Sequence, residues 1–445
     1  MADPSDAAFV PASADLPSYF IPMLSDIERN RCYERAIQQS IASFVTAEGR
    51  APRVLDVGAG TGMLSAMALK HGAACVMALE ANETIAALGE AQLEASFPNG
   101  HWRVGCGLSL NLEKPSQEEG GPFDMLICEL LGTMIHSESM YAYVWDLLMR
   151  GVVRHFGDRT APRFYVVPQA ATMTIAPYSC QAATGIPTGI DYVDMSPIFA
   201  AVYGSPAASL SRKLDWTQDE AQRIMLATAE RKRLAEPVTV LEERYTMVSG
   251  GVQYRPSFSV QLPAGTDPND VVLIAEWTCQ LADGVELDHT LAGVAKLPDA
   301  TRIARWINWG HVFAPLGRAV EGRSRSDKYT FRVNYRPADL DVVAEPVDVA
   351  VSTDAAASKR AKAQDGTGVK GAGDGATSSA ASEGNTAPSS AGKRRIAPQA
   401  VVSEAPKAEE EAEEAEADFV PLSHKDLSRI VILSKAMAAE GYTSV

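Results

Sequence analysis

The sequence predicts an α/β domain built on a parallel sheet, followed by an antiparallel β half. Between Arg53 and about Pro168, apolar runs such as RVLDV, ACVMALE and FDMLICELL alternate with helix-like stretches, which is typical of a parallel sheet covered by helices. From Gln169 to about Val349, short alternating segments such as TMTIAP and SFSVQL are separated by Gly, Pro and Asp turns, which indicates antiparallel strands. One stretch, about residues 213–237, has helical periodicity inside this half.

Length and charge exclude several classes of protein. At 445 residues the chain exceeds one ordinary domain, so we expect two or three folded units. Its 40 basic and 56 acidic residues give a formal net charge of -16, which disfavours nucleic-acid binding and fits a positively charged polypeptide substrate. The cysteines stand singly, so neither a disulfide framework nor a zinc site is expected. A signal-like start and a membrane-spanning apolar run are both missing, which predicts neither secretion nor membrane insertion.

The two ends of the chain differ in composition from its middle. The segment 349–418 is rich in Ala, Gly, Ser, Glu and Lys, and it cannot bury enough apolar surface to offset the entropy of ordering. After it, an amphipathic helix is expected between Ser423 and Gly441, which can cap its ends. The predicted divisions are a disordered 1–15, N-terminal helices in 16–45, the α/β domain 46–168, the β half 169–348 with a helical arm at about 190–237, a disordered tail 349–418 and a C-terminal amphipathic helix in 419–445.

A glycine-rich loop follows the first apolar strand. The strand RVLDV leads through Asp56 into Gly58, Gly60 and Gly62, and the helix-compatible run MLSAMALKHG comes next. Glycines there let the backbone approach a ligand and leave amide N–H groups at the helix start pointing toward it. The spacing G-x-G-x-G is one residue shorter than the dinucleotide fingerprint, which disfavours a pyrophosphate ligand. Glu80 ends the second strand, where its carboxylate can accept hydrogen bonds from a ribose diol.

Two glutamates flank an apolar loop in the segment FDMLICELLGTMIHSESM. Glu129 comes directly after an apolar strand, at the carboxyl edge of the sheet, where open α/β folds bind substrates. Carboxylates are rarely buried at such a place without a cation. Glu129 and Glu138 therefore predict a binding site for a positively charged group, and the alternative is a surface loop with two solvated acids.

The glycine loop with its flanking acids resembles the S-adenosylmethionine-binding Rossmann-like fold of class I methyltransferases. The glutamate pair behind it resembles the double-glutamate loop of protein arginine N-methyltransferases, and the resemblance covers about residues 16–345. It implies a Rossmann-like domain followed by an antiparallel β-barrel with a helical dimerisation arm. It also implies S-adenosyl-L-methionine as the cofactor, no metal, and methyl transfer to the guanidino nitrogen of arginine in proteins.

The same resemblance assigns roles to individual residues. Glu129 and Glu138 are the expected catalytic residues. The N-terminal motif M-L-x-D-x-x-R is matched from Met23 to Arg29, so Arg29 is expected to pair with the carboxylate of the cofactor. The expected cofactor-binding residues are Arg29, Asp56, Gly58, Gly60, Gly62, Glu80 and Met23. The expected substrate-binding residues are Trp309, Tyr19 and Met140, although a core position in a barrel strand is the alternative for Trp309.

Two departures from the family's pattern bear on the product and the assembly. Asn308 stands where the family's T-H-W loop has a histidine, which leaves the pairing of Asp26 open. The segment ELLGTMIHSES replaces the commoner E-W-M-G-Y start, which resembles the monomethylating, type III branch, usually numbered seven, whose product is omega-N-monomethylarginine. Known animal members carry two modules in tandem, so this single module implies a homodimer.

The implied substrates are arginines in glycine-rich or basic segments of RNA-binding proteins, or in histones. A cytoplasmic location is expected, with the nucleus as the alternative. Two other functions stay open: a catalytically silent regulatory partner with a methyltransferase fold, and a small-molecule S-adenosylmethionine-dependent methyltransferase. Loss of the loop, of either glutamate or of Arg29 would favour the first, but all are present. The second would leave the two glutamates without a cation to bind.

Overall fold

The computed structural model of the chain describes residues 20–156, 163–180, 189–190, 193–194, 230–320, 325–335, 342–346 and 420–421. The predicted disordered segments 1–15 and 349–418 lie outside these residues. So do Tyr19, residues 195–229 of the predicted arm and the predicted helix that begins at Ser423. The described residues include both predicted halves.

Two helices precede the first sheet. Asp26 separates α1 (Phe20–Ser25) from α2 (Ile27–Glu48), and its carboxylate caps α2 by accepting a hydrogen bond from Arg29 N at 3.0 Å. Buried side chains recur along α2 every three or four residues, on the face toward the core: Cys32, Tyr33, Ala36, Ile37, Ile41 and Phe44. Among the helices in the described part of the chain, none is long and apolar enough to cross a bilayer.

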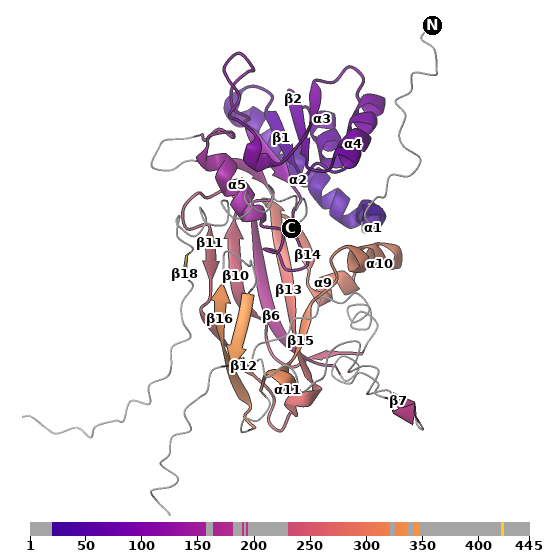
Figure 1. Cartoon of the computed structure of the whole chain (residues 1–445), viewed down its shortest axis with the longest axis vertical. Helices are drawn as coiled ribbons and strands as arrows, with labels where there is room; N and C mark the ends of the chain where they lie inside the picture. Colours follow the sequence, from indigo (N-terminus) through magenta and orange to yellow (C-terminus); the bar gives the residue numbers. More distant parts are fainter. Residues whose placement is uncertain are drawn as a thin grey trace, which may run out of the picture. The chain divides into compact units, whose positions relative to one another are not determined.

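The first sheet consists of five parallel strands in the order β3–β2–β1–β4–β5. The strands are β1 (Arg53–Val57), β2 (Cys75–Glu80), β3 (Trp102–Cys106), β4 (Met125–Cys128) and β5 (Tyr165–Val167). The helices of this domain are α3 (Met63–Lys70), α4 (Glu83–Ser96) and α5 (Met140–Met149), which are labelled in Figure 1. α3 packs on β1 and β2, and α4 packs on β2 and β3. The predicted parallel α/β domain is confirmed. Its strand order changes direction between β1 and β4, where open sheets bind ligands.

The second half of the chain is antiparallel, as predicted. Its larger sheet has the order β14–β13–β6–β10–β11–β18, with β15 paired to β13 and β9 to β6, and a smaller sheet has the order β12–β16–β17. The strands are β6 (Ala170–Ser179), β7 (Gly189–Ile190), β8 (Val193–Asp194), β9 (Lys232–Arg233), β10 (Val238–Arg244), β11 (Val252–Tyr254), β12 (Ser257–Gln261), β13 (Val271–Ala282), β14 (Val285–His289), β15 (Phe313–Pro315), β16 (Lys328–Tyr335), β17 (Val342–Pro346) and β18 (Val420–Pro421). The longest pairing, between β6 and β13, forms the middle of the larger sheet.

Two details of this half differ from the sequence prediction. The predicted helical stretch of about residues 213–237 is extended at its carboxyl end, where β9 pairs Arg233 with Tyr178 of β6, and residues 213–229 lie outside the described part. Pairing with a neighbouring strand outweighs local helical propensity there. The sequence prediction also lacks three helices that the structure contains: α9 (Leu291–Ala295), α10 (Asp299–Asn308) and α11 (Leu316–Ala319).

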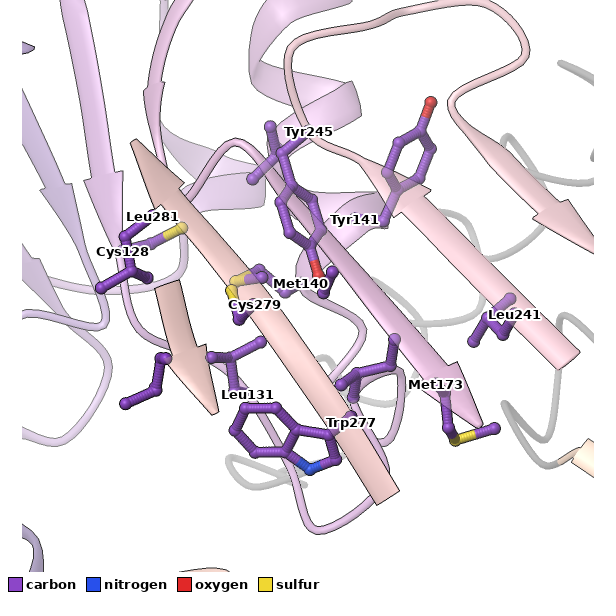
Figure 2. Close-up of a cluster of buried hydrophobic side chains, with 14 of the residues drawn as sticks. Cys128, Leu131, Met140, Tyr141, Met173, Leu241, Tyr245, Trp277, Cys279 and Leu281 are labelled. Atoms are coloured by element: carbon purple, nitrogen blue, oxygen red, sulfur yellow. The ribbon is translucent and has the colours of Figure 1, made fainter. Parts of the chain in front are cut away.

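A continuous hydrophobic core joins the two halves. Figure 2 shows Leu131 from the loop after β4, with Met140 and Tyr141 from α5, beside side chains of the antiparallel half: Met173, Leu241, Tyr245, Trp277, Cys279 and Leu281. A hydrogen bond also joins the two halves, because the Tyr141 hydroxyl donates to Met247 O at 2.8 Å. The chain passes from one half to the other through a cis Val167–Pro168 bond, an isomer that the sequence alone does not predict. This packing holds the loop between the predicted glutamates against the second half.

Asp124, directly before β4, is expected to stabilise the first sheet through its charge. Its side chain is fully buried and accepts hydrogen bonds from Arg50 at 2.6 and 2.7 Å and from Arg53 N at 2.9 Å. Burial alone would raise the pKa of Asp124, but these hydrogen bonds outweigh it and the pKa lies below its ordinary value. The Asp124→Asn variant should therefore lose about 2 to 3 kcal/mol of unfolding free energy in urea at pH 7.

The loss of unfolding free energy in Asp124→Asn should depend on pH. Because the folded-state pKa of Asp124 is depressed, its contribution is present above about pH 4 and fades as the pH falls through the folded-state value. Glu236→Gln is the control, since its partner Arg233 lies 3.6 Å away and Glu236 is 88% exposed, so the expected change is within about 0.5 kcal/mol. Equal losses in the two variants would contradict the role of Asp124.

Candidate functional site

The glycine loop after β1 is closely covered by neighbouring elements. Gly58 and Gly60 have φ angles of 68° and 55°, in the left-handed region that favours glycine. A Cβ atom at Gly58 would lie 2.7 Å from a side-chain carbon of Leu130, and one at Gly60 would lie 3.5 Å from the ring of Phe20. The loop is therefore held between α1 and the loop that follows β4. Gly62 also has a positive φ, of 79°, and is the N-cap residue directly before α3.

The two acids that flank the loop occupy different places. Glu80 accepts hydrogen bonds from Gly60 N and Asn82 N, both at 2.9 Å, so its carboxylate fixes the loop from the end of β2. Asp56 is fully buried and accepts a hydrogen bond from the Ser65 hydroxyl at 2.7 Å. Burial raises the pKa of Asp56 to about 7, against the opposing effect of Ser65. The hydrogen bond between Asp56 and Ser65 thus connects β1 to α3 beneath the glycine loop.

A cavity of about 590 Å³ lies over the glycine loop. Residues from α1, from the loop, from the end of β2, from the segment after β4 and from the end of α10 line it. The predicted site residues among them are Met23, Arg29, Gly58, Gly60, Glu80, Glu129, Glu138 and Trp309. Asp56, Gly62 and Met140 are not among the described residues that line the cavity, and Tyr19 lies outside the described residues. Met140 is instead fully buried in the core shown in Figure 2.

Glu129 binds a cation inside the cavity. Its Oε1 accepts a hydrogen bond from Leu131 N at 3.0 Å, and its Oε2 forms an ion pair with Nη2 of Arg29. The exposed fractions of the Arg29 and Glu129 side chains are 2% and 8%. Burial alone would lower the pKa of Arg29, but the charge and hydrogen bond of Glu129, with contributions from Tyr33 and Asp26, outweigh burial and the pKa is raised. In this structure, the arginine predicted to bind a cofactor carboxylate pairs with a predicted catalytic glutamate.

Glu138 lies at the other end of the same loop. Burial, reinforced by the negative charge of Glu129, raises its pKa to about 8, and the positive charge of Arg29 opposes this. Ser139 follows with a φ of 58°, and it is the only non-glycine residue with a positive φ in the part that the structure describes. Such backbone strain is common at functional sites. The strained residue connects the loop to α5.

Two tryptophans of the second half hold the main chain of this loop. Trp309 Nε1 donates to Leu131 O at 2.6 Å, and Trp277 Nε1 donates to Thr133 O at 3.1 Å. The two rings meet edge to face with centroids 4.9 Å apart. Trp309 is 3% exposed and also lines the cavity, so it contributes both to the core and to the site. It follows the last residue of α10 and does not lie in a strand.

Sequence reasoning missed the partner of Asp26. Arg305 on α10 forms a buried ion pair with Asp26, in which Nε donates to Oδ2 and Nη2 to Oδ1, the latter at 3.0 Å. Arg305 precedes Trp309 by one helical turn, so recognising α10 as a helix would have placed both side chains on one face. Asn308, which departs from the family's histidine, lines the cavity. No group of three or more potential metal ligands occurs among the residues described here.

The chain is similar to protein arginine N-methyltransferases, as the motifs predict. No protein-family model matches it. It is 35% identical over 122 residues to protein arginine N-methyltransferase 7 of Anopheles gambiae, a match that covers 27% of this chain and 18% of that protein. It is 28% identical over 223 residues to a probable protein arginine N-methyltransferase 3 of Arabidopsis thaliana, covering 48% and 33% of the two chains. Each match thus spans a third or less of the relative's length.

The chain is also similar to a solved structure. The crystal structure of Arabidopsis thaliana protein arginine methyltransferase 10 superposes with a TM-score of 0.46 at 16% identity, over 70% of this chain and 86% of that one.

The raised pKa of Glu138 gives a prediction for stability. Between about pH 5 and pH 8 the folded protein keeps a proton on Glu138 that the unfolded chain has released, so the contribution of Glu138 to stability falls as the pH rises through this window. Glu138→Gln removes the buried ionisation. The melting temperature of this variant relative to the wild type should therefore rise between about pH 5 and pH 8 and level off above that.

Differential scanning calorimetry at several pH values measures this difference. Glu118→Gln is the control because Glu118 is exposed, and its melting temperature should follow that of the wild type throughout. If the melting temperature of Glu138→Gln minus that of the wild type stays constant or falls as the pH rises, the Glu138 carboxyl is not buried as described.

Proposed function

We propose that this chain transfers a methyl group from S-adenosylmethionine to the guanidinium group of arginine side chains in proteins. The observation that carries the proposal is the Arg29–Glu129 ion pair, because it shows that the cavity already accommodates a guanidinium on a buried carboxylate. Glu138 lines the same cavity without an ion pair to a cation among the described residues. The similarity to arginine methyltransferases supports the same activity.

Two negative charges would offset the electrostatic repulsion between the two positively charged reactants. The methyl donor is a sulfonium and the acceptor is a guanidinium, and two unit charges about 4 Å apart repel by about 4 kcal/mol at an effective dielectric constant of about 20. Carboxylates on both sides of the acceptor reverse the sign of this interaction. They also fix the planar guanidinium by paired hydrogen bonds, so that one nitrogen is held in line with the methyl carbon. Positioning and charge compensation are then the main contributions of Glu129 and Glu138.

The proton on Glu138 is part of this proposal. With its pKa raised to about 8, the carboxyl is largely protonated near neutral pH in the structure as it stands. An incoming guanidinium is a positive charge close to Glu138, which lowers the pKa of the carboxyl. Substrate binding would then displace this proton and create the second negative charge at the moment it is needed.

The described cavity suits S-adenosylmethionine, which would supply the reactive methyl group. The glycine loop offers close backbone approach at Gly58 and Gly60, and the Glu80 carboxylate lies where it would accept hydrogen bonds from a ribose diol. Arg29 lines the cavity, and its Nε has no hydrogen-bond partner among the described residues, so the guanidinium retains a donor for an anionic group. Asp56 would act indirectly, by holding the loop to α3.

The finer features of the function are part of the same proposal. We infer monomethylation, of the type III kind, from the segment ELLGTMIHSES and from the similarity to members numbered seven. Substrates would be arginines in glycine-rich or basic segments of proteins, which suits the net charge of -16. A homodimer and a cytoplasmic location complete the proposal.

Removing either negative charge should abolish the reaction. Glu129→Gln and Glu138→Gln should each lower kcat/KM for an arginine-glycine peptide by about 100-fold or more, because each removes an electrostatic contact with the guanidinium in the transition state. The measurement is transfer of labelled methyl from S-adenosylmethionine. Glu94→Gln, an exposed position on α4, is the matched control and should keep wild-type activity.

The same assay separates the alternatives. A lysine-substituted twin of the peptide should remain unlabelled. Label on the lysine peptide would contradict arginine specificity, and a wild-type chain that labels neither peptide would favour a silent regulatory partner or a small-molecule methyltransferase. Cofactor affinity measured by calorimetry should change only slightly in Glu138→Gln, since the expected role of Glu138 is toward the acceptor.

The product should stop at one methyl group. After many turnovers on an arginine-glycine peptide, mass spectrometry should detect monomethylarginine and no dimethylarginine. Because a second transfer requires that an already methylated nitrogen enter the same site, a premethylated peptide should be a poor substrate. Accumulation of dimethylarginine would overturn the type III assignment while leaving the methyltransferase proposal intact.

A further inference from the structure

Asp26 and Arg305 form a completely buried ion pair beside the cavity. The exposed fractions of the two side chains are 0% and 1%. Asp26 uses both of its oxygens, because Oδ1 accepts from Arg29 N and Arg305 Nη2, both at 3.0 Å, and Oδ2 accepts from Arg305 Nε. The third nitrogen of Arg305, Nη1, donates to Asp288 O at the end of β14, at 3.3 Å. A fork-shaped guanidinium is needed to bind two acceptors in this way.

The pair joins two segments that both contribute lining residues to the cavity. Phe20, Met23 and Leu24 line the cavity and belong to α1, the helix that ends directly before Asp26. Asn308 and Trp309 also line it and follow Arg305 by about one helical turn. α1 and α10 lie side by side in Figure 1 and contact each other. Asp26 and Arg305 are themselves not among the described lining residues, so any effect on a ligand passes through their neighbours.

The pair also connects to the glutamate loop. The guanidinium carbon of Arg305 lies 5.5 Å from the centre of the Trp309 ring, and that of Arg29 lies 6.0 Å from it. Trp309 in turn donates to Leu131 O, and Arg29 binds Glu129. A displacement of α10 would therefore shift both the α1 residues that line the cavity and the segment that contains Glu129.

We propose that Asp26 and Arg305 are positioning residues whose buried ion pair holds α1 and the start of α2 against α10, and thereby keeps the cavity closed around the cofactor. This inference rests on the proposed function, because the ligand is taken to be S-adenosylmethionine or its product. The pair does not touch the reacting atoms. It fixes the distance between the wall that contains Met23 and the wall that contains Trp309.

The test replaces both charges at once. A single substitution would leave one charge buried without its partner, which is strongly destabilising for reasons unrelated to the ligand. The double variant Asp26→Asn with Arg305→Gln removes both charges and keeps hydrogen-bonding groups of similar shape. Arg305→Lys keeps the positive charge and removes the fork. Arg302→Gln is the matched control, since Arg302 lies on the same helix, is 38% exposed and pairs only with Asp299 in the part of the chain described.

The readout is the affinity for S-adenosylhomocysteine by titration calorimetry, with thermal unfolding measured on the same samples. If the closed form falls to about a tenth of the population, the dissociation constant rises about tenfold. We expect this rise in the double variant, a smaller rise in Arg305→Lys and no change in Arg302→Gln. In turnover, KM for S-adenosylmethionine should rise by the same factor while kcat at saturating cofactor stays nearly constant, a split that a general loss of fold would not produce.

Each outcome decides between the two proposals. A folded double variant with wild-type affinity would overturn the positioning role and leave the proposed function standing. A wild-type chain that does not bind S-adenosylhomocysteine would overturn the proposed function, and the positioning role with it. If the double variant does not fold, Arg305→Lys decides: weaker binding with an intact thermal transition supports the proposal, and unchanged binding refutes it.

Discussion

Burial of opposite charges is the constraint on which the whole site depends. Four ionic side chains, Asp26, Arg29, Glu129 and Arg305, are almost entirely removed from solvent. Each has a partner of opposite charge within hydrogen-bonding distance, which is needed because an isolated buried charge is strongly destabilising. The Asp26–Arg305 pair requires the start of α2 to meet α10, and the Arg29–Glu129 pair requires α2 to meet the segment after β4. The cavity exists where these segments meet over the glycine loop.

The features that the sequence predicts well are those determined by short spans of residues. Apolar runs identify the strands of the parallel sheet, and the spacing of Gly58, Gly60 and Gly62 identifies the loop, because backbone conformation and burial at these positions depend on neighbours in sequence. The position of Glu129 after a buried strand likewise follows from the pattern alone. The structure brings Glu129 and Glu138 to one cavity, which a linear pattern of two acids could only suggest.

The features that the sequence does not predict depend on residues far apart in the chain. Arg305 binds Asp26 across a separation of 279 positions, and no local pattern indicates that an arginine of α10 is buried. The sequence does not predict the orientation of individual side chains either. Asp56 and Met140 match motif positions associated with ligands, yet the first faces Ser65 below the loop and the second packs in the core. A motif gives the kinds of residue that a site needs, whereas tertiary packing decides which of them reach it.

The tryptophan contacts have a consequence for engineering. The indole N–H groups of Trp277 and Trp309 bind main-chain carbonyls, at Thr133 and Leu131, and every amino acid offers the same carbonyl. Side chains in this segment, such as the partly exposed Thr133 and Ser137, can therefore be randomised in saturation libraries without removing either anchor. A search for altered acceptor preference would vary those positions and leave both indoles in place.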